Sequence, residues 1–399
     1  MSEVVSIPQL RFPEFRDEWR VDKFVDLCKF QQGVQVDVEL QSTEPKNNFL
    51  RFLRIENYTQ KSNDFRYIPK ELSSNKSITE NEIAIVRYGA TAGYIGRGLK
   101  GVLANNLFKL VLNKDTLDTD YLFHLLRSYK TFCFFQSEMS GGAMPALSFG
   151  IVGALKLPYS SISEQQKIAA FLTVVDNKIE QLSKKQELLG EYKKGLMQQI
   201  FSQAIRFKAD DGSDFPDWEE KRLGSVGQIV TGKTPSTNNP ELWDGDISFI
   251  TPTDITEQGK YQTKTQRTIT KQRNTKLLPI GSIAYTCIAS IGKMMITTNN
   301  SSTNQQINSI IVNDDFNNEF VYYALLKLTP YIKSTQANTT LPIINKTEFS
   351  GFKIQIPSLQ EQTKIAIFLS SIDRKIEQVG KQLDESKQFK KALLQQMFV

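Results

Sequence analysis

The sequence predicts an α+β protein: two mixed α/β domains in a pseudo-two-fold tandem repeat, each followed by a long helix. The first observation is an internal repeat, because residues 164–201 recur at 361–398, and 19 of the 38 paired residues are identical. The second is a helical pattern of apolar residues in both copies. The shift of 197 positions far exceeds the roughly 20–50 residues of a solenoid repeat, so the chain consists of two large units.

The repeat extends weakly into the globular parts. Gly33 corresponds to Gly232, and Asn105 corresponds to Asn304. The helical segments are close copies, whereas the globular segments share only scattered positions. The helices were therefore retained after the duplication, and the globular segments diverged. We expect four segments, with globular domains at 1–157 and 205–354 and helical segments at 158–204 and 355–399.

The helical segments have matching start signals and matching apolar ladders. Ser161 with Glu164, and Ser358 with Glu361, predict capping boxes. The ladder then steps by four and three residues, a 3.5-residue period typical of a coiled-coil seam. The residues expected to pair the helices are Ile168, Leu172, Val175, Ile179, Leu182, Ile365, Leu369, Ile372, Ile376 and Val379.

Each helix would be about 57 Å long at about 1.5 Å per residue. An internal two-fold would make the pair an antiparallel coiled coil; alternatively, each stripe packs on its own domain. Further apolar residues flank the seam and predict a surface for partner proteins: Phe171, Tyr192, Phe368 and Phe389.

Composition restricts the class of protein. The chain has 399 residues, of which 40% are hydrophobic and 23% charged, as is usual for globular proteins. The three cysteines are few and odd in number, which favours reduced thiols. The N-terminal residues do not resemble a signal peptide, and no apolar run approaches the roughly 20 residues of a membrane helix. We therefore expect a cytoplasmic protein without a membrane partner.

Two basic stretches occur at equivalent places in the repeats. Between residues 258 and 313 there are seven basic residues and no acidic one, and residues 51–109 contain ten basic and five acidic residues. Cations suit phosphates, and neutral amides and hydroxyls suit base edges. A solvated basic surface is the simpler alternative for either stretch alone. The candidate DNA-binding residues are Arg51, Arg54, Asn57, Tyr58, Lys61, Arg66, Tyr88, Arg97, Asn105, Lys233, Thr234, Lys260, Tyr261, Lys264, Arg267, Lys271, Arg273, Lys293 and Asn304.

Catalytic motifs fail in their context. The segment 227–234 matches a P-loop, but Pro235 follows it, and a P-loop must run directly into a helix. His124 is the only histidine and is expected in a core or on a helix surface. We predict no catalytic residue, no metal site and no cofactor in this chain.

The repeated EQxKIAxFL…D-x-KIEQ segments at 164–181 and 361–378 resemble those of the specificity subunits of Type I restriction–modification enzymes. The openings LRFPEF…W at 10–19 and IRFK…FPDW at 205–218 are also similar. The resemblance implies a non-catalytic reader of double-stranded DNA, in which each target-recognition domain binds half of a bipartite target. It also implies two methyltransferase subunits docked on the helices and additional motor–nuclease subunits. S-adenosylmethionine, ATP and magnesium would belong to those partners.

Two other classes of function stay open. One is a coiled-coil scaffold whose globular heads bind protein or RNA. The other is a self-contained DNA-modifying or DNA-cleaving enzyme, against which the missing motifs argue.

Overall fold

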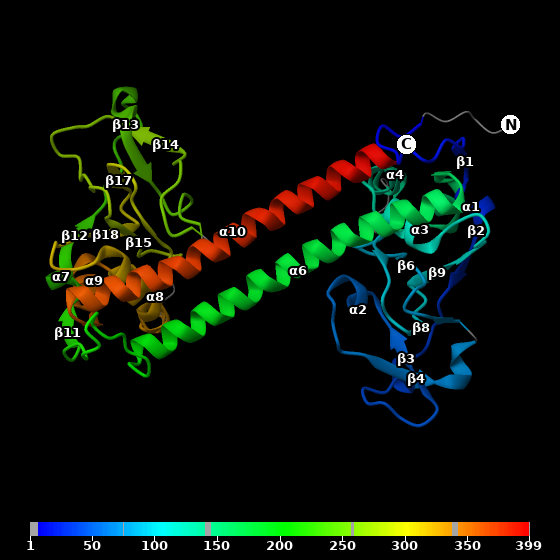
Figure 1. Cartoon of the computed structure of the whole chain (residues 1–399), viewed down its shortest axis with the longest axis horizontal. Coiled ribbons are helices and arrows are strands. Elements are labelled where there is room, and N and C mark those ends of the chain that lie inside the picture. The colour runs from blue at the N-terminus through cyan, green and yellow to red at the C-terminus, as the bar shows by residue number, and fades with distance from the viewer. Residues whose placement is uncertain (1–6, 75, 140–144, 257–258, 337–341, 399) are drawn as a thin grey trace. The chain divides into compact units, whose positions relative to one another are not determined.

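The computed structural model describes residues 7–74, 76–139, 145–256, 259–336 and 342–398. The chain divides into two compact units, unit 1 (Met1–Ser183 with Lys381–Val399) and unit 2 (Lys184–Gly380). Each unit consists of one globular domain and half of each long helix, α6 (Ile162–Phe201) and α10 (Leu359–Met397) (Figure 1). A unit is therefore completed by a helix segment from the other repeat.

Unit 1 contains three small sheets, with strand orders β1-β10, β2-β9-β6-β7 and β4-β3-β8-β5. Its strands are β1 (Arg20–Lys23), β2 (Cys28–Gln32), β3 (Phe49–Leu53), β4 (Arg66–Pro69), β5 (Ser77–Ile78), β6 (Ala84–Val86), β7 (Ile95–Gly96), β8 (Gly101–Leu103), β9 (Leu107–Leu112) and β10 (Lys156–Tyr159). Its helices before α6 are α1 (Phe24–Leu27), η1 (Val38–Leu40), α2 (Ile55–Thr59), η2 (Lys70–Ser73), α3 (Thr119–Leu126), α4 (Tyr129–Met139) and α5 (Phe149–Ala154).

Unit 2 repeats this topology with strand orders β11-β19, β12-β18-β15-β16 and β14-β13-β17, except that an isolated bridge between Leu278 and Ser301 stands in place of β5. Its strands are β11 (Glu219–Arg222), β12 (Gly227–Thr231), β13 (Trp243–Ile250), β14 (Arg267–Ile269), β15 (Ile283–Thr286), β16 (Met294–Ile296), β17 (Ser301–Thr303), β18 (Ile307–Val312) and β19 (Lys353–Ile356). Its helices before α10 are α7 (Leu223–Val226), η3 (Pro240–Leu242), α8 (Asn318–Ser334) and α9 (Lys346–Gly351).

The two long helices pack antiparallel within each unit. In unit 1, Ile168 and Leu172 of α6 share a core cluster with Leu393 and Met397 of α10. In unit 2, Leu196 and Ile200 of α6 pack with the first turns of α10. The long helices, the two mixed domains and the antiparallel pairing agree with the fold class that the sequence predicts.

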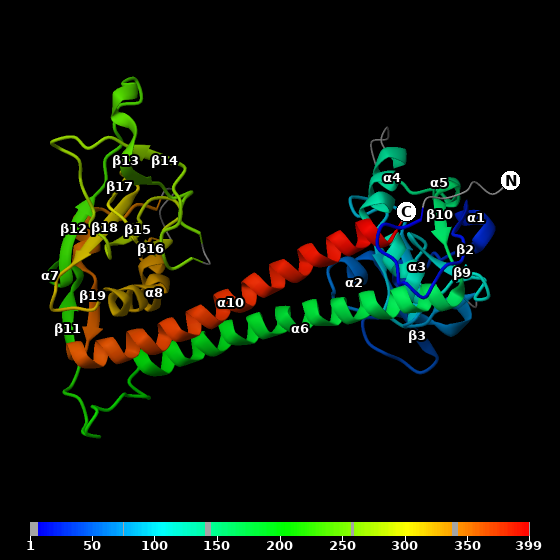
Figure 2. The ribbon, with the colours of Figure 1, turned by 45° about the horizontal axis from the view of Figure 1, so that its top comes forward.

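The contact between the two long helices is not a core of its own. At each end it merges with the core of a globular domain. The cluster that contains Ile168 and Leu172 also contains Trp19 and Tyr121, and α8 lies along the first half of α10 (Figure 2). Each apolar ladder therefore packs partly on the other long helix and partly on its own globular domain. Ile168, Leu172, Leu182, Ile365, Leu369, Ile372 and Val379 are buried, whereas Val175, Ile179 and Ile376 are partly exposed.

Ion pairs also join the two long helices within each unit. In unit 1, Lys390 pairs with Asp176, and in unit 2, Lys193 pairs with Asp373. The residue numbers of each pair differ from those of the other by the repeat shift of 197, so the two pairs are equivalent. These cations do not break the seam but fix its register.

The predicted capping boxes are wrong in their reciprocal half. Ser358 Oγ does accept a hydrogen bond from Glu361 N, at 3.4 Å. The carboxylates do not return to the serine backbone, because arginines from the domain openings bind them. Arg11 Nε donates to Glu164 Oε1 at 2.7 Å, and Arg206 Nη2 donates to Glu361 Oε2 at 2.8 Å. Both glutamate side chains are fully buried.

The glutamines after these glutamates join the helix starts to the preceding loops. Gln165 accepts from Asp118 N and donates to Thr116 O, each at 2.9 Å. Gln362 accepts from Asn317 N at 2.9 Å. The repeated Arg-Phe and Glu-Gln motifs therefore lock the start of each long helix onto its own globular domain.

Candidate nucleic-acid interface

A cavity of about 260 Å³ in unit 1 collects several of the predicted residues. It lies between the loop after α2, strand β7 and helix α3. The predicted residues on its wall are Asn57, Tyr58, Lys61 and Arg97. The wall also contains Phe123 and Arg127, which the sequence analysis missed. Their spacing of four residues was the available signal, since residues at this spacing share a face once the segment is helical.

Asn57 and Tyr58 are corrections, because both side chains are buried. Asn57 Oδ1 accepts from Arg54 N at 2.8 Å, and its Nδ2 donates to Ser62 O at 3.0 Å. Burial raises the pKa of the Tyr58 hydroxyl. The Arg54 guanidinium pairs with Asp64 at 3.2 Å. Asn57 and Arg54 thus shape the loop after α2 through contacts within the chain.

The remaining unit 1 candidates lie around this loop and on the adjoining sheets. The Arg51 guanidinium lies 4.2 Å from the centre of the Phe65 ring. Arg66 is partly exposed on β4, and Tyr88 is 36% exposed. Asn105 Nδ2 donates to Gln35 Oε1 at 3.2 Å.

The glycine turns explain why the repeat preserves Gly33 and Gly232. A Cβ at Gly33 would lie 2.2 Å from Ala104 O, and one at Gly232 would lie 2.2 Å from Asn304 O. The close approach places the turn beside the repeated amide in both units. In unit 2 this edge brings together Lys233, Thr234 and Asn304, and Thr234 Oγ1 donates to Gln305 Oε1 at 2.7 Å.

The P-loop-like segment has no P-loop geometry. Residues 227–231 form strand β12, and the next helical turn in this described stretch is η3. Among the described residues, no group of three or more histidine, cysteine, aspartate or glutamate side chains is placed to hold a metal ion. Within the same part of the chain, no helix is long and apolar enough to cross a membrane.

Most basic candidates of unit 2 are exposed: Lys233, Lys264, Arg267, Lys271 and Arg273. Lys293 is partly exposed. The Arg267 guanidinium stacks 3.3 Å from the centre of the Trp243 ring, an arrangement that holds a cation at a surface without neutralising it.

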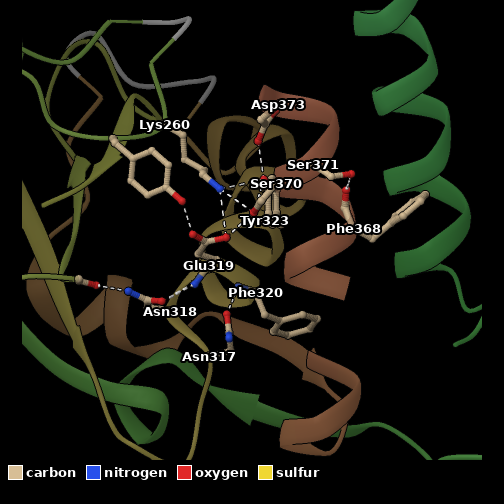
Figure 3. Close-up of polar contacts among 12 residues, drawn as sticks. Lys260, Asn317, Asn318, Glu319, Phe320, Tyr323, Phe368, Ser370, Ser371 and Asp373 are labelled. Atoms are coloured by element: carbon tan, nitrogen blue, oxygen red, sulfur yellow. Dashed lines mark hydrogen bonds and ion pairs between the residues drawn. The ribbon is translucent and has the colours of Figure 1, made fainter. Parts of the chain in front are cut away.

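Lys260 is the clearest correction, because it is buried and its ammonium group lies among the polar partners that Figure 3 shows. Its Nζ donates to Ser370 Oγ at 2.7 Å and to Tyr323 OH at 3.2 Å, and it pairs with Glu319 at 3.2 Å. Burial lowers the pKa of Lys260, although Glu319 opposes that shift. The hydroxyl of Tyr261, another candidate, is also bound to Glu319. A buried ammonium group requires such partners, so Lys260 is a structural residue.

Two segments of the chain, residues 16–189 and 216–386, each match the family model of the Type I restriction modification DNA specificity domain. The duplicated α+β fold, the paired helices and the two matched domains place the chain in a class of DNA-specificity proteins. The chain belongs to the family of Type I restriction–modification specificity subunits, with two target-recognition domains.

Individual relatives agree with this family. The chain is 27% identical to the Type I restriction enzyme MjaVIII specificity subunit of Methanocaldococcus jannaschii, over 96% of this chain and 92% of the relative. It is also 27% identical to the HindI specificity subunit of Haemophilus influenzae, over 69% of this chain and 77% of that one. The fold matches the crystal structure of the S subunit from M. genitalium with a TM-score of 0.64, at 17% identity and 99% coverage of both chains.

Proposed function

We propose that each globular domain reads one half of a bipartite sequence in double-stranded DNA, and that the paired helices dock two methyltransferase subunits. The duplication carries this proposal, because two units of one topology hold their helices by the same contacts but present different polar side chains. Phosphate contacts would position each domain, and amide, hydroxyl and guanidinium groups would select bases.

The chemistry of modification and restriction would then lie in other subunits. S-adenosylmethionine, ATP and magnesium would be bound by the methyltransferase and motor–nuclease partners, and this chain would act in the cytoplasm without a cofactor. Family membership supports this division, since the matched domain is named for DNA specificity. A solved structure that this fold matches with a TM-score of 0.56, at 18% identity, concerns complex assembly and conformational transition of the type I R-M system.

Exposed aromatic residues on the long helices support a docking role. Tyr192 is 56% exposed and Phe389 is 54% exposed, and the repeat makes them equivalent. The other two residues expected on this surface are used internally. Phe171 packs on Phe12, with ring centres 6.0 Å apart, and Phe368 packs on Phe207, with ring centres 5.6 Å apart.

The primary test is selection from a randomised duplex library, using the chain co-purified with its methyltransferase partner. We expect two short fixed blocks separated by a constant gap that carries no sequence preference. Replacing the unit 2 domain by another recognition domain should change one block only. Recovery of no preferred sequence by an intact complex would favour the scaffold alternative, and turnover by the chain alone would favour the enzyme alternative.

A second test addresses the unit 2 surface. Changing Lys264, Arg267 and Lys271 together to alanine should weaken DNA binding and reduce its salt slope by about 1 for each phosphate that the variant no longer binds. Lys346 and Lys353, both exposed in the same unit, provide a control double variant. Unchanged affinity of the triple variant would remove these residues from the DNA interface.

A further inference from the structure

The cavity of unit 1 occupies a position that unit 2 fills with its own chain. In unit 2, Ile296 N donates to Lys260 O and Gln262 N donates to Ile296 O, each at 2.8 Å. Strand β7 of unit 1 occupies the place of β16 in its sheet. At the repeat shift of 199 that applies to this region, Arg97 takes the place of Ile296, and Arg97 lines the cavity.

A difference in loop length explains why one position is filled and the other is open. Phe52 pairs with Arg66, and its counterpart Phe249 pairs with Arg267. These positions differ by 197 for the phenylalanines and by 201 for the arginines, so the unit 2 loop is longer by four residues. The longer loop reaches β16 and inserts Lys260, whereas the shorter loop stops at the cavity wall.

Basic side chains line the open position. Arg97 and Arg127 lie over the same Phe123 ring, at 4.3 and 4.9 Å from its centre, and Lys61 stands on the opposing loop. Arg97 pairs with Asp120, and Arg127 lies 4.0 Å from Asp176, which already binds Lys390. Arg97 and Arg127 thus each contact a carboxylate, and Arg54 on the bordering loop contacts Glu56 and Asp64, whereas Lys61 has no ion pair among the described residues.

At the filled position of unit 2, both lysines are paired with carboxylates. Lys260 pairs with Glu319 and Lys193 with Asp373, and Arg374 also acts on the Tyr261 hydroxyl. The equivalent of Tyr323 in unit 1 is His124, whose pKa burial lowers to about 4, so the imidazole adds no charge near pH 7. The lysine on the cavity wall of unit 1 thus lacks an ion pair among the described residues, whereas the lysine that fills the site in unit 2 is paired with Glu319.

The loop that borders the cavity also has an uncommon backbone conformation. Lys61 has a φ of 51°, in the left-handed region that a residue with a side chain adopts only when its surroundings hold it there. Asn57 supplies that support, because its amide donates to Ser62 O. The backbone that carries Lys61 is therefore held in place by this hydrogen bond.

We propose that this cavity is an anion site that takes a phosphodiester group of the bound DNA backbone, an inference that rests on the proposed function. Guanidinium groups match the oxygens of a phosphate with paired hydrogen bonds. The ring of Phe65, which is partly exposed on the wall, provides apolar surface for the adjoining sugar. Unit 1 would then bind one phosphate in a cavity whose equivalent in unit 2 is filled by the longer loop.

The test uses the complex with its methyltransferase partner and a duplex obtained by selection. One backbone linkage at a time is replaced by an uncharged methylphosphonate. We expect one linkage at which neutralisation weakens binding of the unaltered protein about tenfold or more. The same replacement should have no further effect on the double variant Lys61→Ala/Arg127→Ala, whose salt slope should be lower by about 1.

A charge-matched control is Lys114→Ala/Lys130→Ala, which removes two exposed cations of unit 1 away from the cavity. This control should keep the sensitive linkage. If every linkage affects the cavity variant and the unaltered protein equally, the phosphate site is refuted although DNA binding stands. If the unaltered complex binds no duplex with sequence preference, the proposed function fails instead.

Inorganic phosphate separates a free anion from the DNA backbone as the ligand. A saturable rise in melting temperature with phosphate, absent in the cavity variant, together with equal sensitivity to all methylphosphonates, would assign the site to a free anion and overturn the DNA contact. A linkage whose effect is lost in the cavity variant supports the backbone contact whether or not free phosphate binds.

Discussion

Units 1 and 2 hold the long helices by the same contacts, which form a shared frame, and among their differences is one polar cluster. In the frame, Arg11 binds Glu164 just as Arg206 binds Glu361. In the cluster, unit 1 has His124 beside an open cavity, whereas unit 2 has Tyr323 bound to a buried lysine. Contacts that position the helices have been retained between the copies, and the side chains next to the variable loops have changed. A specificity subunit needs this separation, because new targets must not disturb assembly.

The largest test of this comparison concerns the frame. Glu361→Ala should lower the free energy of unfolding by about 3–5 kcal/mol, since it leaves Arg206 without its buried partner. Glu164→Ala should cost somewhat less, because Glu361 also accepts from Trp218 Nε1 at 3.2 Å, whereas Trp19 Nε1 has no partner among the described residues. Urea unfolding of both variants measures the difference. A larger loss in Glu164→Ala would show that the indole bond contributes nothing.

The next test separates the units by pH. Burial lowers the pKa of His124 to about 4 from its ordinary 6.5 and outweighs the attraction of Asp176. The unfolded chain therefore binds a proton between pH 6.5 and 4 that the folded chain does not. Stability should fall as the pH drops through this window, by at most about 3 kcal/mol, and level off below it.

His124→Tyr places the unit 2 residue in unit 1 and should abolish this part of the acid sensitivity. The comparison requires urea unfolding of both proteins at pH 7 and pH 4.5, so that other titrating groups cancel. An equal loss of stability on acidification in the two proteins would contradict the burial of a neutral imidazole.

The smallest effect distinguishes the filled position from the open one. Lys260→Met should reduce stability by about 2 kcal/mol, because the hydrogen bonds of a charged group are removed while Glu319 keeps only its hydroxyl donors. Lys61→Met should change stability by less than about 0.5 kcal/mol, since that side chain is exposed. Thermal or urea unfolding checks both. Similar costs at the two sites would mean that Lys61 has partners like those of Lys260.

The interface candidates could be predicted from sequence only in part. Charge and amide content pointed to the loops that surround the cavity, and Lys61 and Arg97 do lie there. Burial could not be anticipated for Lys260, because the carboxylate that binds it is 59 positions away at Glu319. Asn57 was likewise assigned to DNA, although an amide one turn into a short helix can bind the backbone before it. Which residues contact DNA stays a prediction.

The sequence by itself determined the duplication, the two long helices and their antiparallel pairing, because repeats and apolar periodicity are local patterns that packing must satisfy. Only the tertiary structure decided what Glu164 and Glu361 bind, and which of two equivalent loops fills its neighbouring site. Those outcomes depend on partners from distant segments. The four-residue difference in loop length is present in the sequence, but which strand the longer loop meets is decided only in the folded chain.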